Sequence, residues 1–185
     1  MKNEISSLEL MYLVKELKAL ENSKVDRIYN SKDSKNEFLF AFHISNEGKH
    51  FLKIILPSVI FLSKSKDTYE NMSGFGMMLR KYLEGGFLKS IEQKDFERVL
   101  ELKFDSKIEG KLTRFNLIIE LFSKGNVIFC DEKYKILNLV EEQHWAAREL
   151  KRGLDYIFPK SKNKIIDISK DEFKETIQNS EKESV

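Results

Sequence analysis

The spacing of apolar residues predicts an amphipathic helix near the amino terminus. Five apolar side chains recur at helical intervals with charged residues between them: Leu10, Leu13, Val14, Leu17 and Leu20. Immediately before them, Ser6-Ser7-Leu8-Glu9 fits a capping box, in which Ser6 and Glu9 satisfy the first free backbone amides. We therefore expect a helix that begins after Ser6, ends near Asn22-Ser23 and packs one face on a core.

A second helix is predicted over residues 74–86. Its apolar face holds Phe75, Met78, Leu79, Tyr82 and Leu83, and Gly85 suits the left-handed conformation that ends a helix. Two adjacent cations, Arg80 and Lys81, lie on this helix. A third helix is predicted over residues 143–152, capped by Gly153, and Ser169-Lys170-Asp171-Glu172 fits a second capping box that opens a short charged helix.

The rest of the chain has the pattern of β-strands. Phe38, Phe40, Phe42 and Ile44 recur at alternate positions, and Asn46-Glu47-Gly48 has the composition of a turn into a strand over residues 51–56. Weaker strand patterns lie at 25–29 and 59–63, and a β-meander is predicted over residues 98–104, 112–122, 126–131 and 135–140. Because both faces of the first strands are fairly apolar, we expect an α+β fold with β-sandwich-like sheets flanked by helices, or a sheet with helices packed on it.

Charge and length narrow the classes of protein. The 185 residues include 32 basic and 30 acidic side chains, a formal net charge of +2. This balance excludes the broad positive field of a strongly basic nucleic-acid binder but leaves room for a local basic patch. The length suits one domain, with the start of a second as the alternative.

Membrane and redox signals are weak. The most apolar region, residues 51–62, is interrupted by Lys53 and Pro57 and is too short to span a bilayer, and the amino terminus has no signal-peptide pattern. Cys130 is the single cysteine, and its apolar neighbours indicate a buried, inert thiol. We expect a soluble cytoplasmic protein with no membrane partner.

The usual catalytic patterns are missing from the sequence. His43, His50 and His144 are scattered without a second ligand at metal-binding spacing, so we expect no metal site. Gly74-Phe75-Gly76 lacks the rest of a dinucleotide fingerprint, and no phosphate loop or nucleophile elbow occurs. We therefore expect no catalytic residues, no cofactor and no enzymatic activity.

Arg98 opens a predicted strand in which Leu100, Leu102 and Phe104 share its parity. A guanidinium at such a position either reaches the rim of the sheet or needs an acidic partner, because a buried unpaired charge is very costly. A structural salt bridge and a phosphate or base contact are both open. Nearby cations at 103, 107, 111 and 114 have the pattern of a solvated strand edge.

Several ordered blocks resemble the NFACT amino-terminal domain, and they cover the chain through about Pro159. The most characteristic block is Phe75-Gly76-Met77-Met78-Leu79-Arg80-Lys81-Tyr82-Leu83-Glu84-Gly85. The other blocks keep the family's order: residues 5–10, Glu16-Leu17, residues 25–30, Ile91-Glu92-Gln93, Phe96-Glu97-Arg98-Val99, Glu120-Leu121, residues 125–128, Ile136-Leu137 and Gly153-x-x-Tyr156-x-x-Pro159.

The resemblance implies a ribosome-associated quality control factor, a family also described as fibronectin-binding protein A-like or nuclear export mediator factor-like. Such a domain is expected to bind the large ribosomal subunit beside a stalled peptidyl-tRNA and, within the full-length protein, to recruit alanyl-tRNA for tailing without mRNA. The implied organisation is an NFACT amino-terminal domain over residues 1–165, then a charged helix or linker over 166–185 toward a helix-hairpin-helix and coiled coil.

The resemblance also implies a fold like the amino-terminal domain of formamidopyrimidine DNA glycosylases. Those enzymes use an amino-terminal proline as the nucleophile, whereas this chain starts Met1-Lys2-Asn3-Glu4 and has prolines at Pro57 and Pro159 alone. A glycosylase-related nucleic-acid enzyme is therefore a weak alternative. An adhesin-like fibronectin-binding module is the stronger one.

The functional positions implied by the resemblance fall on Glu9, Glu97 and Arg98. The family usually has Asp at both acidic positions, so this chain keeps the charge and adds a methylene at each. We expect these three residues to contact RNA, together with Arg80 and Lys81. Structural roles compete for two of them: Glu9 completes the capping box with Ser6, and Glu97 suits an ion pair with a base other than Arg98, because adjacent strand residues point to opposite faces.

Overall fold

The computed structural model describes residues 4–64, 71–145 and 148–160. Two α-helices lie in these ranges, α1 (Ser7–Leu17) and α2 (Gly74–Leu83), and a short 3-10 turn, η1 (Lys18–Leu20), follows α1. The strands are β1 (Lys24–Tyr29), β2 (Glu37–Ile44), β3 (Gly48–Ile55), β4 (Val59–Ser63), β5 (Phe87–Gln93), β6 (Val99–Ile108), β7 (Lys111–Glu120), β8 (Asn126–Asp131), β9 (Ile136–Leu139), β10 (Gln143–Trp145) and β11 (Arg148–Leu150).

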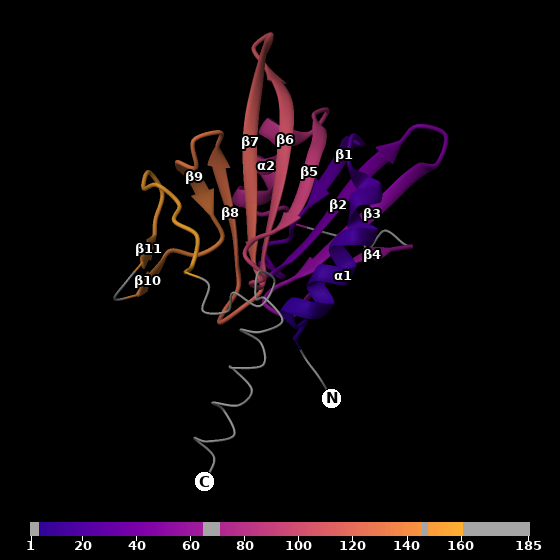
Figure 1. The fold of residues 1–185 in the computed structure, drawn as a ribbon. Helices are drawn as coiled ribbons and strands as arrows, with labels where there is room; N and C mark the ends of the chain where they lie inside the picture. Colours follow the sequence, from indigo (N-terminus) through magenta and orange to yellow (C-terminus); the bar gives the residue numbers. More distant parts are fainter. Residues whose placement is uncertain (1–3, 65–70, 146–147, 161–185) are drawn as a thin grey trace.

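Nine of these strands form one antiparallel sheet in the order β4-β3-β2-β1-β5-β6-β7-β8-β9 (Figure 1). Its two halves, β1–β4 and β5–β9, are joined through β1 and β5, which share a single residue pair, Lys24 with Phe87. The predicted α+β class is confirmed. The sequence pattern predicted β-sandwich-like sheets, whereas the structure has one continuous nine-stranded sheet, and the strand β5 was not predicted.

Side chains from both halves of the sheet meet in one apolar core. Phe38, Phe40 and Phe42 of β2 belong to the same cluster as Leu102 of β6 and Phe129 of β8. Because alternate residues of a strand point to the same face, the alternation predicted for β2 delivers these three rings together. The core therefore fixes how β1–β4 lie relative to β5–β9.

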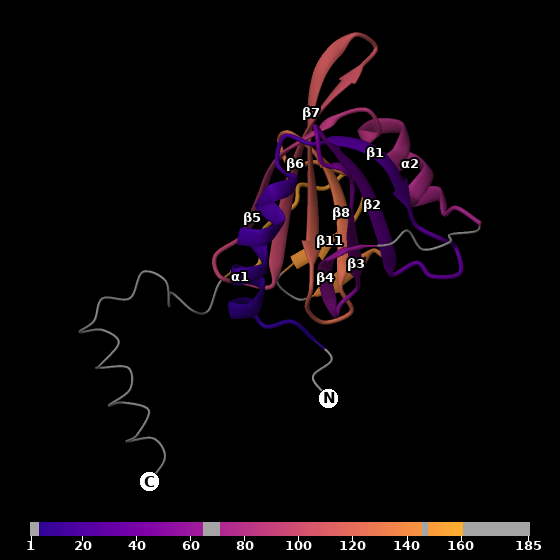
Figure 2. The same ribbon diagram turned by 90° about the vertical axis from the view of Figure 1, so that its right-hand side faces the viewer.

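The two helices close this core from different sides (Figure 2). Helix α1 packs against β4 and β5, and it buries Leu10, Val14 and Leu17. Helix α2 packs against β1 and β6, and it buries Leu79 and Leu83. The predicted apolar faces of both helices are confirmed, and Gly85 has the predicted positive φ of 82°.

The carboxy-terminal part of the described chain covers the outer face of β6–β9. A second cluster forms there from Val99, Ile118, Ile128 and Cys130 of the sheet, together with Leu150 and Tyr156 of the covering segment. We define the covering segment as Tyr134 of the β8–β9 turn together with residues 148–158. It turns a face of the sheet that would meet water into a buried one.

The helix predicted over residues 143–152 is wrong. Gln143–Trp145 and Arg148–Leu150 form an antiparallel hairpin, and Gly153 follows it with a φ of 88°. Burial of Leu150 and the ion pair of Arg148 with Glu120 stabilise an extended chain along the sheet. These tertiary contacts outweigh the weak local helical preference of the segment. The second capping box, the domain boundary after residue 165 and the charged helix over 166–185 lie outside the described residues.

Candidate nucleic-acid interface

The first turn of α1 places Glu9 through the capping box that the sequence predicts. Glu9 Oε2 accepts hydrogen bonds from the backbone N–H and the hydroxyl of Ser6, both at 2.7 Å, and Ser6 Oγ accepts one from the Glu9 N–H at 3.2 Å. This reciprocal arrangement satisfies two backbone N–H groups and one hydroxyl group at the helix start. The structural role considered for Glu9 is therefore confirmed.

Arg98 lies directly before β6, and its guanidinium forms an ion pair with Glu4. The Arg98 side chain is 26% exposed and the Glu4 side chain 47% exposed. An ion pair so open to solvent stabilises a fold by only about 0–1 kcal/mol, because water screens the charges. Arg98 thus has the acidic partner expected of a structural role, and it keeps a weakly held guanidinium at the rim of the sheet.

Glu97 lies in the turn between β5 and β6, which Gln93 ties to α1. The side-chain amide of Gln93 donates to the carbonyl oxygens of Ser7 and Glu97, each at 2.9 Å. Two residues of this turn, Asp95 and Phe96, have positive φ values of 46° and 56°, a conformation that costs L-residues roughly 1–2 kcal/mol each. Strained backbone of this kind persists where surrounding contacts enforce it.

The structure brings Glu9, Glu97 and Arg98 to one corner of the molecule. We define the α1–β6 corner as Glu4, Glu9, Gln93, Glu97 and Arg98. Within the described residues, the Glu97 carboxylate makes no hydrogen bond or ion pair, and Arg98 pairs with Glu4 rather than with Glu97. The expectation that these adjacent residues do not pair with each other is confirmed.

Arg80 lies away from this corner and fastens α2 to β1. Its Nε donates to the Ile28 carbonyl oxygen at 2.6 Å and lies 3.3 Å from Glu84 Oε1, which itself accepts from the Ile28 N–H at 3.1 Å. Its guanidinium also lies 5.3 Å from the centre of the Tyr29 ring. Burial lowers the pKa of Arg80, and the charge of nearby Arg27 lowers it further. These contacts give Arg80 a structural task, and its contact with RNA stays a prediction.

Lys81 follows Arg80 on α2 but faces solvent. Its Nζ lies 5.4 Å from the centre of the Tyr82 ring, and the side chain lines a groove between α2 and β9. The five residues predicted to contact RNA therefore fall in two places: Glu9, Glu97 and Arg98 at the α1–β6 corner, and Arg80 with Lys81 on α2. Figure 2 shows α1 and α2 on different sides of the sheet.

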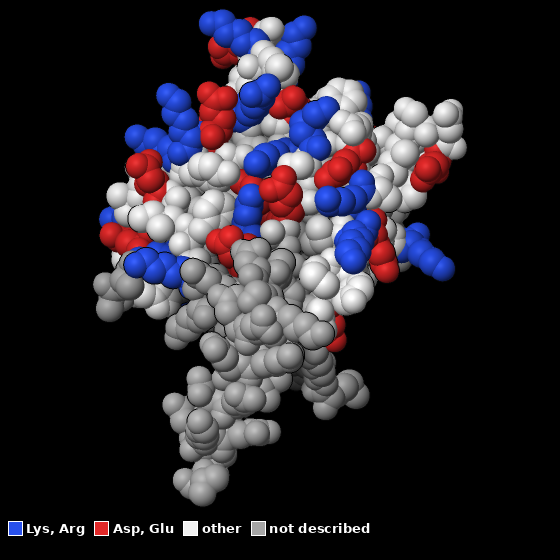
Figure 3. All heavy atoms as spheres, in the orientation of Figure 1, with Lys and Arg blue, Asp and Glu red and all other residues white. Residues whose placement is uncertain are grey.

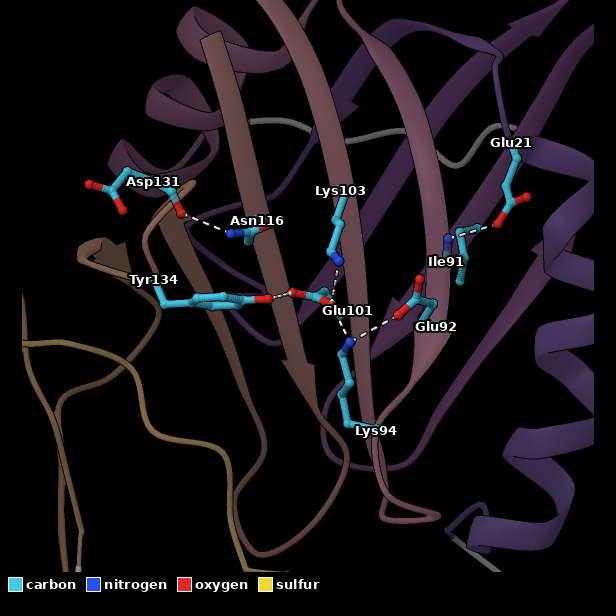
Figure 4. A network of polar contacts seen from close by, with 9 residues as sticks. All are labelled: Glu21, Ile91, Glu92, Lys94, Glu101, Lys103, Asn116, Asp131 and Tyr134. Carbon is cyan, nitrogen blue, oxygen red and sulfur yellow. Dashed lines mark hydrogen bonds and ion pairs between the residues drawn. The ribbon is translucent and has the colours of Figure 1, made fainter. Parts of the chain in front are cut away.

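Sequence analysis missed a buried acid, Glu101, at the centre of a polar network under the covering segment (Figure 4). The Tyr134 hydroxyl donates to Glu101 Oε1 at 2.7 Å, and Lys94 and Lys103 form ion pairs with Oε2. Burial raises the pKa of Tyr134 to about 12, and the hydrogen bond to Glu101 adds to this effect. Burial lowers the pKa of Lys94, but its bonds to Glu101 and Glu92 outweigh burial, and the net shift is upward.

A second buried acid, Glu120, anchors the same segment at another point. Arg148 forms an ion pair with Glu120 Oε1, and the Tyr156 hydroxyl donates to the same oxygen at 2.7 Å. The Arg148 guanidinium lies 4.9 Å from the centre of the Tyr156 ring. Burial raises the pKa of Tyr156 well above its usual range. Glu101 and Glu120 stand at positions that alternate with core residues, which is the pattern of a solvent-facing side chain, so their burial could not be predicted from this pattern.

The single cysteine and two of the histidines have defined surroundings in the part of the chain that the structure describes. Burial raises the pKa of the Cys130 thiol to about 12, so the thiol stays protonated at neutral pH. His50 Nε2 lies 3.3 Å from Glu47 Oε2, and His144 Nδ1 lies 3.1 Å from Glu149 Oε1. Among described residues, no three His, Cys, Asp or Glu side chains are grouped to hold a metal ion, and neither helix is long and apolar enough to cross a membrane.

Surface charge gives no single dominant patch on the face seen in Figure 3. Basic and acidic side chains alternate over the described part of that face. Arg114 pairs with Asp105 at 3.4 Å and Lys49 pairs with Asp26 at 2.8 Å, so neighbouring charges neutralise one another. The described part of this face therefore carries no broad field of one sign.

Comparison with known proteins places the chain in a family. The family described as NFACT N-terminal and middle domains matches residues 6–185. This chain belongs to the NFACT family. The expectation drawn from the ordered blocks, with Phe75–Gly85 the most characteristic, is confirmed.

Relatives of this NFACT chain carry names from ribosome quality control. The archaeal Rqc2 homolog aRqcH of Methanocaldococcus jannaschii is 29% identical over 166 residues, which cover 88% of this chain and 24% of that protein. Ribosome quality control complex subunit 2 of Saccharomyces cerevisiae is 37% identical over 143 residues, which cover 75% of this chain and 13% of that protein. The chain therefore spans about a quarter or less of these relatives.

A solved structure of the NFACT type shares the fold. The amino-terminal domain of the fibronectin-binding protein PavA from Streptococcus pneumoniae superposes with a TM-score of 0.81 at 30% identity, and the match covers 93% of this chain and 68% of that one. The α+β architecture of an antiparallel sheet with two helices is thus the architecture of this family.

Proposed function

We propose that this NFACT chain is the amino-terminal RNA-binding module of a ribosome quality control factor. It binds the large ribosomal subunit with its stalled peptidyl-tRNA and helps to recruit alanyl-tRNA for template-free tailing in the cytoplasm. The names of the relatives from Methanocaldococcus jannaschii and Saccharomyces cerevisiae support this role. Because the chain matches only a part of each relative, tailing is assigned to a whole protein to which this domain contributes binding.

The observation that carries the proposal is the arrangement of the α1–β6 corner. The Arg98 guanidinium pairs with Glu4, Glu4 and Glu9 line one shallow pocket, and Gln93 ties the backbone of Glu97 to the first turn of α1. The corner therefore combines one guanidinium with the carboxylates of Glu9 and Glu97, from chain positions as far apart as α1 and the start of β6. A guanidinium suits the geometry of a phosphate, whereas a carboxylate repels phosphate and accepts hydrogen bonds from base or ribose donors. Such a mixture fits a structured RNA better than it fits a uniform polyanion.

The weak pairing of Arg98 makes it available to a ligand. Glu4 holds the guanidinium in a partly exposed ion pair, so a phosphate can replace the carboxylate at little cost. Gln93 fixes the backbone on both sides of the corner, and this preorganisation lowers the entropic cost of binding. Arg80 is committed to β1, so in this proposal it supports α2 and Lys81 makes the direct contact.

We propose binding rather than catalysis as the activity of this domain. The buried, protonated Cys130 offers no nucleophile at neutral pH. The proposal keeps the resemblance of the fold to the amino-terminal domain of formamidopyrimidine DNA glycosylases, and a glycosylase reaction forms no part of it.

Filter binding of the 185-residue protein to a tRNA mixture across a salt series tests the proposal. Arg98→Glu is compared with Arg114→Glu, which makes the same charge change at an exposed ion pair elsewhere on the sheet. We expect Arg98→Glu to weaken binding by about 10-fold or more, because it removes one phosphate contact and adds a repulsive charge, and Arg114→Glu by less than about 3-fold. Equal effects of the two variants, or no binding of wild-type protein at low salt, would contradict the proposal.

Fibronectin binding is a second candidate, which the name of the Streptococcus pneumoniae structure favours. It predicts that nuclease-treated protein binds immobilised fibronectin and that Arg98→Glu leaves this binding unchanged. The RNA proposal predicts the opposite: nuclease-treated protein does not bind fibronectin. Measuring both ligands on the same nuclease-treated preparation separates the two candidates.

A further inference from the structure

A groove of about 520 Å³ lies between α2 and β9, away from the α1–β6 corner. Its apolar lining includes Met77, Met78 and Tyr82 of α2, and Met77 is 55% exposed. Its basic lining consists of Lys81 from α2, Lys135 beside β9 and Arg152 after β11. The groove volume falls within the roughly 300–1,000 Å³ that small-ligand sites occupy, so it suits one or two nucleotide-sized units rather than a duplex.

Contacts between the walls hold the groove open without a ligand. The Asn138 side-chain amide donates to the sulfur of Met78 at 3.3 Å, which links β9 to α2. The Gly153 N–H donates to the Ile136 carbonyl oxygen at 2.9 Å, which links the wall carrying Arg152 to β9. Tyr82 packs on the core, with its ring centre 5.5 Å from that of Phe115. The groove is therefore preformed.

Among the residues that the structure describes, Arg152 has no acidic partner, unlike the other arginines. Each of the other five forms an ion pair with a carboxylate: Arg27, Arg80, Arg98, Arg114 and Arg148. Within the described ranges, neither Arg152 nor Lys81 nor Lys135 forms such a pair. In the β8–β9 turn, one Asp131 oxygen accepts hydrogen bonds from the N–H groups of Lys133 and Lys135, at 2.8 and 2.9 Å. Asp155 lies opposite Lys135 in an isolated β-bridge, and among the described residues it forms no ion pair with Lys135.

Three cations around one apolar groove repel each other, and an anion relieves this repulsion. We propose that the groove binds single-stranded RNA, with Lys81, Lys135 and Arg152 on its phosphates and a base against Met77 and Tyr82. A positively charged track beside an aromatic or apolar platform is how single strands are held, because every base has a flat face to stack. A peptide of acidic residues alone, such as polyglutamate, offers the charge but no such ring. The choice of RNA as the ligand rests on the proposed function, while the groove is a different site from the α1–β6 corner.

Fluorescence anisotropy with a labelled eight-nucleotide oligoadenylate and the 185-residue protein tests this site. The double variant Lys81→Ala/Arg152→Ala is compared with Lys15→Ala/Lys18→Ala, which removes the same charge from exposed positions on the side of α1. We expect the groove variant to weaken binding about 10-fold and to lower the slope of log Kd against log salt by about 1.4, since each single-strand phosphate contact contributes about 0.7. The control variant should change Kd less than about 2-fold.

Met77→Ala tests whether a base is recognised as well as a phosphate. Because Met77 is exposed, its truncation leaves the fold intact, and we expect weaker binding of oligoadenylate by about 3-fold with unchanged binding of inorganic polyphosphate.

Equal losses of oligoadenylate affinity in both double variants would overturn the proposal, and so would competition by polyglutamate at the same concentration as RNA. If tRNA binding depends on Arg98 while oligoadenylate binding is unchanged by the groove substitutions, the groove proposal fails and the proposed function stands. If oligoadenylate binding depends on the groove residues while tRNA binding does not depend on Arg98, the α1–β6 corner is not the tRNA site.

Discussion

Tyr134 donates its hydroxyl hydrogen to Glu101 across the outer face of the sheet, and this bond ties the covering segment to a fully buried carboxylate. The buried Glu120 carboxylate holds a second part of this segment, because it pairs with Arg148 and accepts a hydrogen bond from the Tyr156 hydroxyl. The covering segment is thus held to the sheet by two acids as well as by apolar packing.

Removing the Tyr134 hydroxyl should make stability less sensitive to alkaline pH. The folded-state pKa of Tyr134 is raised to about 12, so the folded protein keeps this proton where the unfolded chain loses it. The resulting stability is complete below pH 10 and falls as the pH rises from about 10 toward 12. Urea unfolding at several pH values should show a shallower decline for Tyr134→Phe than for wild type. Parallel declines would show that Tyr134 does not titrate in this way.

Glu120→Ala should cost about 3–5 kcal/mol of unfolding free energy. It leaves the Arg148 guanidinium buried without its carboxylate, and an unpaired buried charge is strongly destabilising. Urea denaturation measures the loss, and Glu141→Ala is the matched control, because its pair with Lys124 is exposed and worth at most about 1 kcal/mol. A cost for Glu120→Ala as small as that of the control would contradict the anchoring role.

Alanine substitutions of Arg80 and Lys81 should differ in their effect on the free energy of unfolding. Arg80→Ala removes the bond to the Ile28 carbonyl oxygen and should lower stability by about 1.5–3 kcal/mol, the range for hydrogen bonds of charged groups. Lys81→Ala changes a surface side chain and should stay within about 0.5 kcal/mol. Thermal or urea unfolding of both variants checks this, and any RNA-binding loss in Arg80→Ala must be measured where the variant is fully folded.

Glu4→Gln should increase the affinity for tRNA if Arg98 contacts phosphate. The substitution removes the carboxylate that competes for the guanidinium, and an exposed ion pair of about 0.2–1 kcal/mol corresponds to a gain of about 1.5- to 5-fold. The gain should vanish in the double variant Glu4→Gln/Arg98→Ala. Filter binding at constant salt measures it, and an equal gain in the presence and absence of Arg98 would assign the effect to net charge.

Ser6→Ala should destabilise the start of α1 by about 1 kcal/mol, since the side chain that caps the Glu9 N–H is lost. Ser7→Ala, one residue inside the helix, is the control and should be nearly neutral. Urea denaturation compares the two. If Ser6→Ala leaves tRNA affinity unchanged while Glu9→Gln lowers it, the carboxylate of Glu9 serves RNA as well as the cap.

Local signals in the sequence predicted much of the fold. The capping box at Ser6 and Glu9, the apolar face of α2 and the alternation of Phe38, Phe40 and Phe42 each depend on residues a few positions apart, and each is confirmed. The same local reasoning failed over residues 143–152, where a remote face of the sheet imposes a hairpin. It also failed for β5, which joins the two halves of the sheet.

Sequence patterns were enough to predict the α+β class, the helices α1 and α2 and, through the ordered blocks, the NFACT family. The folded structure was needed to show that Arg98 pairs with Glu4, that Glu101 and Glu120 are buried under the covering segment, and that Lys81, Lys135 and Arg152 share one groove. Helix caps and alternating faces are set by neighbours along the chain, so local patterns reveal them. The partner and the burial of a charged side chain depend instead on residues that lie far away in sequence and approach only when the sheet closes.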